Sequence, residues 1–413
     1  MERVVVTGLG VVSPVGQSPD EFFDALLDCR SGVRLVCHEF GTSTYQFAGA
    51  TIDFDASSHW PQHQASQFDR ATQFALFASK RALADACLSL TEEESFRAGV
   101  YWGTGLGGAT SIEDSYKQLY IGNGRVRPTS VVLAMNNAAA GNISIANGFR
   151  GPVVNVSTAC SSSATAIGEA YRAIGFGFAD VVVCGGSEAL VTYGNLRAWD
   201  AMQALARPDA SDVSRSCKPF SANRTGIVLG EGAAALILES ESRATKRGAR
   251  IYAEVVGYGN SADALGISKP DASGQVRAMT AALEDARINA DDVDYLNAHG
   301  TATAIGDVVE TKAIKQTFGC SATALPISST KALHGHVMGG TGAIEMLAAL
   351  CALQRGVIPP TAHLECPDPA CDLDYTANVP REARVDVVMS NSFGFGGMNS
   401  VLVARRFERT PHA

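Results

Sequence analysis

The sequence has no excess of positive charge. Its 33 lysines and arginines are outnumbered by 42 aspartates and glutamates, which gives a formal net charge of −9. Nucleic acids and anionic membranes attract positive surfaces, so neither kind of partner is expected. The chain also lacks an apolar run long enough to span a membrane, and its first residues enter a strand-like segment without a signal-peptide pattern. We therefore expect a cytoplasmic protein with no membrane partner.

Disulfide, metal and nucleotide signatures are also missing. The ten cysteines are scattered without paired spacing, which favours a reducing compartment over a disulfide framework. His334 and His336 could form a His-x-His metal pair, but no third ligand is evident, so no metal site is expected. There is no P-loop, and the glycine-rich stretch 103–108 lacks the final spacing and the acidic partner of a dinucleotide fingerprint. A bound nucleotide is therefore not expected.

The chain has enough apolar residues for a large core. Of its 413 residues 46% are hydrophobic, which suits two ordinary domains or one large duplicated domain. Strand-like and helix-like segments alternate, and this predicts α/β layers around a largely parallel sheet. Strands are expected at 4–7, 99–102, 180–184, 233–239, 251–258, 294–298 and 326–328, and helices at 71–86, 162–174, 275–287, 307–318 and 341–353. The first and third of these strands are expected to end at glycines, at Gly8 and Gly185. Residues 408–413 have the composition of a loose polar tail.

Two helices rich in small residues indicate a duplication. The segments 162–174 and 341–353 each follow a short strand and a polar turn. We interpret this as a weak internal repeat, with an N-terminal half at residues 1–240 and a C-terminal half at 241–413. If the halves pack face to face, the turn with Cys160 and the turn with His336 meet at the shared centre.

Cys160 has the surroundings of a nucleophile. It follows the apolar run Val153–Val156 and directly precedes a helix of small residues, so a strand runs into a tight turn and then into a helix. A thiol at a helix N-terminus lies near unpaired N–H groups and the positive end of the dipole, which favour the thiolate. A buried cysteine is more often a small hydrophobe, and Cys184 at the end of an apolar strand is read in that way.

Two later segments offer partners for this thiol. One contains His299 in Asn-Ala-His-Gly-Thr, and the other contains Lys331 and His336 in Lys-Ala-Leu-His-Gly-His. One cysteine and two histidine segments are the parts of a thiol-based acyl transfer site. Each histidine alone would more often be structural, and Lys331 could be a surface lysine, so the prediction depends on the three segments together.

Several motifs in a fixed order carry a resemblance to a known family. The chain resembles the β-ketoacyl-acyl carrier protein synthases, the condensing enzymes of type II fatty acid and polyketide assembly. The resemblance covers essentially the whole chain. Its motifs are Val4–Pro14, Asn155–Ser162, Lys218–Ser221, Gly230–Gly232, Asn297–Thr303, Ser329–Lys331, Gly335–His336 and Asn391–Gly397.

The resemblance implies a fold and a division of labour. The fold is thiolase-like, with duplicated α/β halves that form a five-layered α-β-α-β-α core. Cys160 takes an acyl chain, and His299 and His336 hold the enolate that forms when malonyl-acyl carrier protein loses carbon dioxide. The main-chain N–H groups of Cys160 and Phe395 form the second oxyanion hole, and Phe395 acts as a gate. Lys331 organises the histidines, with Glu345 as its counter-charge.

The resemblance also implies substrates and partners. Leu106, Trp199 and Phe393 line the substrate site, and Thr301 and Thr303 hydrogen-bond the phosphopantetheine arm, so the enzyme needs no cofactor of its own. The partner is an acyl carrier protein. The family docks its carrier on a basic patch, but residues 64–68 here hold no lysine or arginine, and this departure, with the bulk of Trp199, points to a specialised lipid or polyene pathway. A homodimer is expected, and a heterodimer with a chain-length partner is the alternative.

Two other functions remain open from the sequence. A non-catalytic chain-length partner would bind acyl chains in a heterodimer, but such partners lack the nucleophile. A cysteine hydrolase would use Cys160, one histidine and Asn391. The second histidine and Lys331 favour condensation over hydrolysis.

Overall fold

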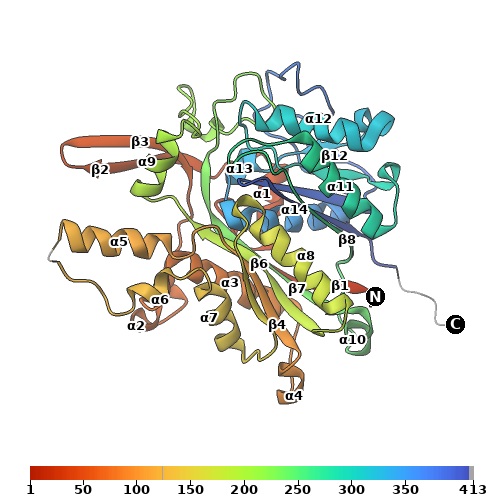
Figure 1. The fold of residues 1–413 in the computed structure, drawn as a ribbon, viewed down its shortest axis with the longest axis horizontal. Helices are drawn as coiled ribbons and strands as arrows, with labels where there is room; N and C mark the ends of the chain where they lie inside the picture. Colours follow the sequence, from red (N-terminus) through yellow and green to blue (C-terminus); the bar gives the residue numbers. More distant parts are fainter. Residues whose placement is uncertain (123, 409–413) are drawn as a thin grey trace.

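The computed structural model describes residues 1–122 and 124–408. The polar tail expected at 408–413 lies, after Glu408, outside these described residues. Two α/β halves share one continuous sheet, and Figure 1 shows the N-terminal half in red to yellow-green beside the C-terminal half in green to blue. None of the described helices combines the length and apolar character needed to cross a bilayer.

The two halves repeat one strand order. Numbered within its own half, each set of five strands follows the order three, two, four, five, one. The first set is β5 (Val153–Val156), β4 (Ala98–Gly103), β6 (Val181–Ala189), β7 (Leu229–Ser240) and β1 (Val4–Val12). The second set is β10 (Ile327–Ser328), β9 (Tyr295–Asn297), β13 (Val387–Gly394), β14 (Met398–Arg405) and β8 (Ala253–Ala262). The sets join where β1 pairs with β8, antiparallel. The duplication expected from the sequence is thus present in the topology. The largely parallel sheet expected from the sequence is wrong, because five consecutive pairings in the middle of the strand order, from β13–β14 to β7–β6, are antiparallel.

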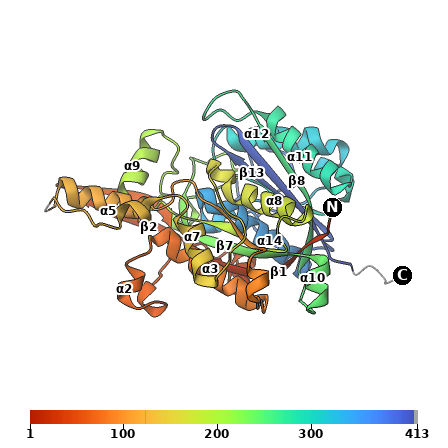
Figure 2. The ribbon, with the colours of Figure 1, turned by 60° about the horizontal axis from the view of Figure 1, so that its bottom comes forward.

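Helices cover the sheet in layers. The central helices α8 (Ser162–Gly175) and α14 (Thr341–Arg355) pack against each other and against strands of both halves. The outer layers are α3 (Arg70–Asp85) with α7 (Ala138–Asn147) on the first half, and α11 (Ala272–Ala286) with α12 (Gly306–Phe318) on the second. Figures 1 and 2 show α8 and α14 in the interior of the molecule, and the expected five-layered thiolase-like fold is confirmed.

Shorter elements lie around this core. The hairpin β2 (Val33–Phe40) and β3 (Ser43–Ala50) joins the sheet through β7 and projects from the body in Figure 1. A separate two-stranded sheet contains β11 (Val357–Ile358) and β12 (Arg381–Glu382). The remaining helices are α1 (Pro19–Leu27), α2 (Gln62–Ala65), α4 (Glu92–Ser95), α5 (Ala109–Tyr120), α6 (Ser130–Ala134), α9 (Tyr193–Ala201), α10 (Glu241–Lys246) and α13 (Lys331–His334).

The strand ends expected at Gly8 and Gly185 are wrong. The strand β1 continues to Val12 and β6 continues to Ala189. The glycines of β1 serve packing against α3 instead, since a Cβ on Gly10 would lie 2.1 Å from the carbonyl oxygen of Ala78. A missing side chain therefore brings the helix onto the strand, which a local reading of glycine as a turn residue does not reveal.

We predict that Gly10→Ala destabilises the fold. The added Cβ meets main-chain atoms of α3 that cannot rotate away, and overpacking of this kind costs about 1–3 kcal/mol. Gly266→Ala is the matched control, because its Cβ would meet only the Lys269 side chain at 3.6 Å. Urea and thermal unfolding should show the loss for Gly10→Ala alone, and equal stability of the two variants would contradict the packing argument.

Candidate active site

A strained turn presents Cys160 between β5 and α8. Ala159, directly before it, has a φ of 52°. This value lies in the left-handed region, which is energetically unfavourable for any residue that has a Cβ. The Ser161 hydroxyl donates to the carbonyl of Thr158 at 2.8 Å, and the Ser162 hydroxyl donates to that of Ala159 at 2.7 Å. These bonds hold the turn, so the thiol has a fixed position at the start of the central helix, where it is 4% exposed.

His336 is held in one tautomer. Its Nδ1 accepts the main-chain N–H of Met338 at 3.0 Å and lies 2.9 Å from the hydroxyl of Thr341. A main-chain N–H can only donate, so in the neutral ring the proton is on Nε2. No described side chain bonds this Nε2. The ring therefore offers an unused N–H donor.

Lys331 orients His299 in a similar way. Its ammonium lies 3.5 Å from Nδ1 of His299 and donates to the carbonyl oxygen of the same residue at 2.5 Å. Because an ammonium has no acceptor, Nδ1 faces a donor and Nε2 carries the proton of His299. The rings of His299 and His336 meet edge to face with centroids 5.4 Å apart.

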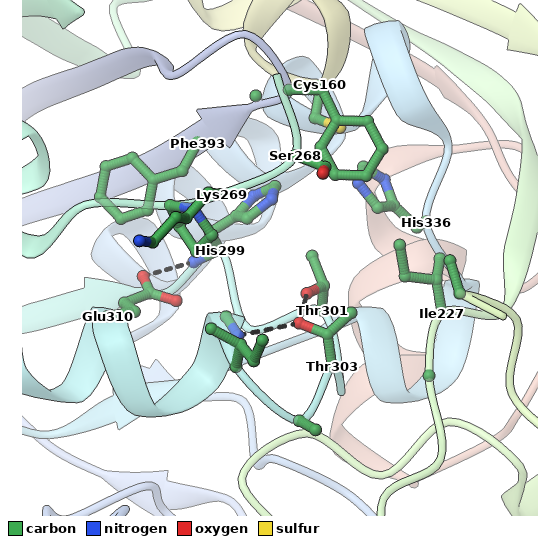
Figure 3. A pocket seen from close by; sticks show the side chains of 18 of the residues that line it. Cys160, Ile227, Ser268, Lys269, His299, Thr301, Thr303, Glu310, His336 and Phe393 are labelled. Carbon is green, nitrogen blue, oxygen red and sulfur yellow. Dashed lines mark hydrogen bonds between the residues drawn. The ribbon is translucent and has the colours of Figure 1, made fainter. Parts of the chain in front are cut away.

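The structure brings the expected catalytic side chains into one place. Potential ligand atoms of Cys160, His299 and His336 all lie within 4.8 Å of one another, and Figure 3 shows the three side chains around one space. His334 is not part of this group, because its Nε2 bonds the hydroxyl of Thr330 and its ring lies against Phe22. The His-x-His pair considered from the sequence therefore does not converge on one point.

Both histidines are neutral at ordinary pH. Burial lowers the pKa of His299 and of His336 well below the usual value, and the positive charge of Lys331 lowers it further. The site thus contains two uncharged imidazoles, each with one N–H donor. Such donors can stabilise a developing negative oxygen, and neither ring has to lose a proton first.

The thiolate expected for Cys160 is wrong for this state of the protein. Burial raises the pKa of the Cys160 thiol to about 11. The main-chain N–H groups of Phe395 and Cys160 and the charge of Lys331 oppose this rise but do not overcome it. Loss of water around the sulfur therefore outweighs the helix N-terminus.

Lys331 is fully buried and paired. Its ammonium forms a salt bridge with Glu345 of α14 at 2.5 Å, and both side chains are 0% exposed. Burial raises the pKa of Glu345 to about 7, while Lys331 pulls it down. The structure thus places Glu345 where the resemblance expects the counter-charge of Lys331.

Glu310 is a site residue that the sequence analysis missed. Its carboxylate accepts the main-chain N–H groups of His299 and Gly300, both at 2.8 Å, and a side-chain N–H of Asn391 at 3.2 Å. Glu310 thus fixes the loop that carries His299, and Asn391 supports Glu310. A signal was present in the sequence, since Glu310 precedes the apolar pair Ala313 and Ile314 by one helical turn and so falls on the buried face of α12.

A cavity of about 400 Å³ leads to the catalytic group. Of the residues expected at the substrate, its lining includes Trp199, Thr301, Thr303, Phe393 and Phe395. The hydroxyls of Thr301 and Thr303 lie 3.1 Å apart. Figure 3 shows the two side chains next to each other on one wall of the cavity. The rings of Trp199 and Phe395 stack with centroids 5.5 Å apart. An apolar wall and a wall with hydroxyls thus meet at the thiol.

Leu106 is not part of this cavity wall. It is 48% exposed and lies in the turn after β4, where its N–H donates to Glu188 at 3.2 Å. Leu106 does not line the cavity in the described part of the chain, so its expected contact with the acyl chain stays a prediction.

A buried thiol beside two neutral imidazole donors, at the meeting point of duplicated halves, defines an enzyme that forms and consumes thioesters. The family models agree: "Beta-ketoacyl synthase, N-terminal domain" matches residues 1–244, and "Beta-ketoacyl synthase, C-terminal domain" matches residues 252–365. The chain belongs to the β-ketoacyl synthase family and is an acyltransferase of the condensing type.

Curated relatives match almost end to end. The chain is 41% identical over 412 residues to 3-oxoacyl-acyl-carrier-protein synthase 2 of Staphylococcus aureus (strain COL), covering 98% of this chain and 99% of the relative. It is 44% identical over 405 residues to nodulation protein E of Rhizobium meliloti (strain 1021), with the same coverage. The family resemblance found in the sequence is thus confirmed.

Solved structures share the fold. A β-ketoacyl synthase from Burkholderia phymatum STM815 superposes with a TM-score of 0.90 at 36% identity, covering 99% of this chain and 100% of that chain. A type II polyketide ketosynthase, solved in complex with its acyl-carrier protein and bound to a hexaketide, gives a TM-score of 0.90 at 32% identity, with 98% and 100% coverage.

We predict that alkylation of Cys160 by iodoacetamide shows no plateau near neutral pH. Only the thiolate reacts, and with a pKa of about 11 the thiolate fraction rises roughly tenfold per pH unit between pH 7 and 10. Mass spectrometry after short exposures at each pH measures the rate, with free glutathione as the unshifted thiol. A plateau for Cys160 below the pH at which glutathione levels off would show that the resting site holds a thiolate.

Proposed function

We propose that the protein condenses an acyl chain on Cys160 with malonyl-acyl carrier protein to give β-ketoacyl-acyl carrier protein. The observation that carries this proposal is the group of one thiol and two neutral imidazoles within 4.8 Å, in which His336 and His299 each keep an Nε2–H for substrate. A hydrolase needs one such histidine, whereas condensation needs a pair to hold an enolate.

Acyl transfer comes first. The sulfur of Cys160 attacks the carbonyl carbon of an acyl thioester, and the carrier thiol leaves with the proton that the Cys160 thiol gives up. The tetrahedral oxygen is held by the main-chain N–H groups of Phe395 and Cys160, the two groups whose hydrogen bonds already favour negative charge on the sulfur. The thiolate is the attacking form, so Cys160 gives up its proton in this step, and because exchange of one thioester for another is nearly balanced in energy, the departing carrier thiolate takes that proton.

Condensation follows. The malonyl thioester loses carbon dioxide, and its carbonyl oxygen becomes an enolate oxygen that accepts the two Nε2–H groups of His299 and His336. The enolate carbon then attacks the acyl carbon on Cys160, a carbon–carbon bond forms, and the Cys160 sulfur leaves as a thiolate that takes up a proton from water to restore the thiol. Lys331 acts through His299, whose tautomer it fixes, and it touches the carbonyl of that residue instead of the substrate.

The cavity walls suit a phosphopantetheine arm and an acyl chain. Thr301 and Thr303 present hydroxyls to the amides of the arm, and Trp199 and Phe393 present aromatic surface to the chain. The chemistry needs no further group, so we propose that the enzyme has no cofactor of its own. Phosphopantetheine arrives on the acyl carrier protein, the partner in one of the similar solved structures.

Two alternatives are less well supported. A chain-length partner would not need Cys160 and both histidines. In a hydrolase triad Asn391 would orient a histidine, but here its amide donates to Glu310. The similar proteins include a 3-oxoacyl-acyl-carrier-protein synthase and a type II polyketide ketosynthase, and the bulk of Trp199 in the cavity favours a specialised pathway.

The expected homodimer has a suitable surface. The strand β5 forms an edge of the sheet, and α6 and α7 beside it expose apolar side chains. Val131 is 70% exposed, Val132 60%, Ile145 80% and Val153 of β5 43%. A second copy, or a chain-length partner in the heterodimer alternative, would cover this surface.

The cytoplasmic location and the division of the chain into halves at residues 1–240 and 241–413 stay predictions.

Cys160→Ala should abolish acyl-enzyme formation and condensation while malonyl decarboxylation continues, because only the histidines serve that step. His336→Ala should show the opposite pattern: Cys160 is still acylated, and condensation falls by about 10²–10³ with the loss of one oxyanion donor. Intact-protein mass spectrometry and release of carbon dioxide measure the two half-reactions. A stable acyl adduct on another cysteine of the wild type would contradict the assignment.

We also predict that Phe395 is a gate over the thiol. It lies between Gly394 and Gly396, and Gly396 and Gly397 have φ values of 82° and 69°, which a residue with a Cβ adopts only with strain. Phe395→Ala should raise hydrolysis of the acyl-enzyme several-fold by admitting water and should broaden chain-length preference. Structures of the free and acylated enzyme provide the direct test: a ring that keeps its stacking on Trp199 after acylation excludes gating.

A further inference from the structure

One buried carboxylate joins the two halves beside the active site. Glu188 lies near the end of β6 and is 0% exposed. Its Oε2 accepts the N–H of Gly105 at 2.6 Å and the N–H of Gly339 at 3.1 Å. Its Oε1 accepts the hydroxyl of Thr104 at 3.1 Å and the N–H of Leu106 at 3.2 Å. Residues 104–106 belong to the first half and Gly339 to the second.

The hydrogen-bond donors around Glu188 restrict which side chain can occupy its position. Three of its four donors are main-chain N–H groups, which cannot accept a hydrogen bond. Within the described residues, the ion pairs do not include Glu188. Burial raises the pKa of Glu188 to about 7, and these four donors oppose that rise by favouring the ionised carboxylate. An amide in its place would direct an N–H group at a main-chain N–H group on one side.

Both turns that Glu188 holds also position reacting groups. Met338, directly before Gly339, donates the N–H that fixes the tautomer of His336. On the other side, the Ser162 hydroxyl lies 3.4 Å from the carbonyl of Thr104, and a Cβ on Gly103 would lie 2.3 Å from the nitrogen of Ser163. The turn after β4 thus supports the first residues of α8, which follow Cys160.

The two turns touch each other at their glycines. A Cβ on Gly339 would lie 2.3 Å from the nitrogen of Gly105. The main chains of the two halves are therefore in direct contact here, with the carboxylate of Glu188 bonded to both.

We propose that Glu188 is a positioning residue that sets the spacing between Cys160 and His336 by holding one turn of each half on a single carboxylate. This inference rests on the proposed condensation. Acylation uses groups next to Cys160, and decarboxylation uses the two histidines. Only carbon–carbon bond formation needs the enolate at the histidines to reach the acyl carbon on Cys160, so an error in spacing affects that step most.

Glu188→Gln tests the spacing. We expect condensation to fall at least tenfold, while acylation of Cys160 and decarboxylation of malonyl-acyl carrier protein each change by less than about threefold, because a shift near 1 Å between reacting groups costs up to about 10²-fold. Gly339→Ala forces the same turns apart without altering charge and should give the same pattern. Glu239→Gln is the control. Glu239 is also 0% exposed, but its carboxylate pairs with Arg243 and Arg247 and bonds neither of the two turns, so all three rates should stay near wild type.

Crystal structures of wild type and Glu188→Gln add a readout independent of turnover. The proposal requires the 338–340 turn to move relative to the 104–106 turn and the Cys160 sulfur to move relative to Nε2 of His336. Unmoved turns, or three rates that fall together, would overturn it. A wild-type enzyme that acylates Cys160 but forms no β-ketoacyl product would instead overturn the proposed function, and the two failures are thus distinguishable.

Discussion

The contact between the N-terminal ends of α8 and α14 is the constraint on which the rest of the structure depends. A Cβ on Gly342 would lie 2.9 Å from the Cβ of Ala164, and the hydroxyl of Ser163 accepts the N–H of Ala343 at 2.9 Å. Helices approach this closely only where their side chains are small. Cys160 lies just before one helix and His336 just before the other, so the contact places a residue of each half at a shared point.

Charge in this centre is organised around one buried cation. Lys331 is paired with Glu345, and burial raises the pKa of the nearby Glu310, which the N–H groups of Gly300 and His299 and the charge of Lys331 lower. The same charge depresses the pKa of both catalytic histidines. Burial is the main reason that the imidazoles stay neutral, and the ammonium of Lys331 adds to it while it favours the ionised form of Glu310, which holds the loop of His299. Removal of water makes each of these effects larger than it would be at the surface.

Dehydration has a second consequence at the thiol. It raises the pKa of Cys160, so the nucleophile is not a preformed thiolate, and the same dry surroundings strengthen the hydrogen bonds offered to an oxyanion or enolate. The thiolate that attacks has to form during the reaction, and the main-chain N–H groups of Phe395 and Cys160 and the charge of Lys331 favour it there. A carbanion formed there is also protected from protonation by water, which is the competing fate of an enolate.

The sequence by itself determined the local parts of this protein. Strand–turn–helix patterns identified Cys160, ordered motifs identified His299, Lys331 and His336, and two helices of small residues indicated the duplication, because each signal lies within a short segment. Only the tertiary structure decided the relations between segments. It placed Glu188 as the anchor of two loops far away in the chain and bonded Glu310 to the loop of His299. It also put Leu106 outside the cavity wall, packed Gly10 of β1 against α3, and raised the pKa of Cys160 against the effect of the helix N-terminus. These outcomes depend on burial and on main-chain donors from distant residues, and neither is encoded in the spacing of residues along one segment.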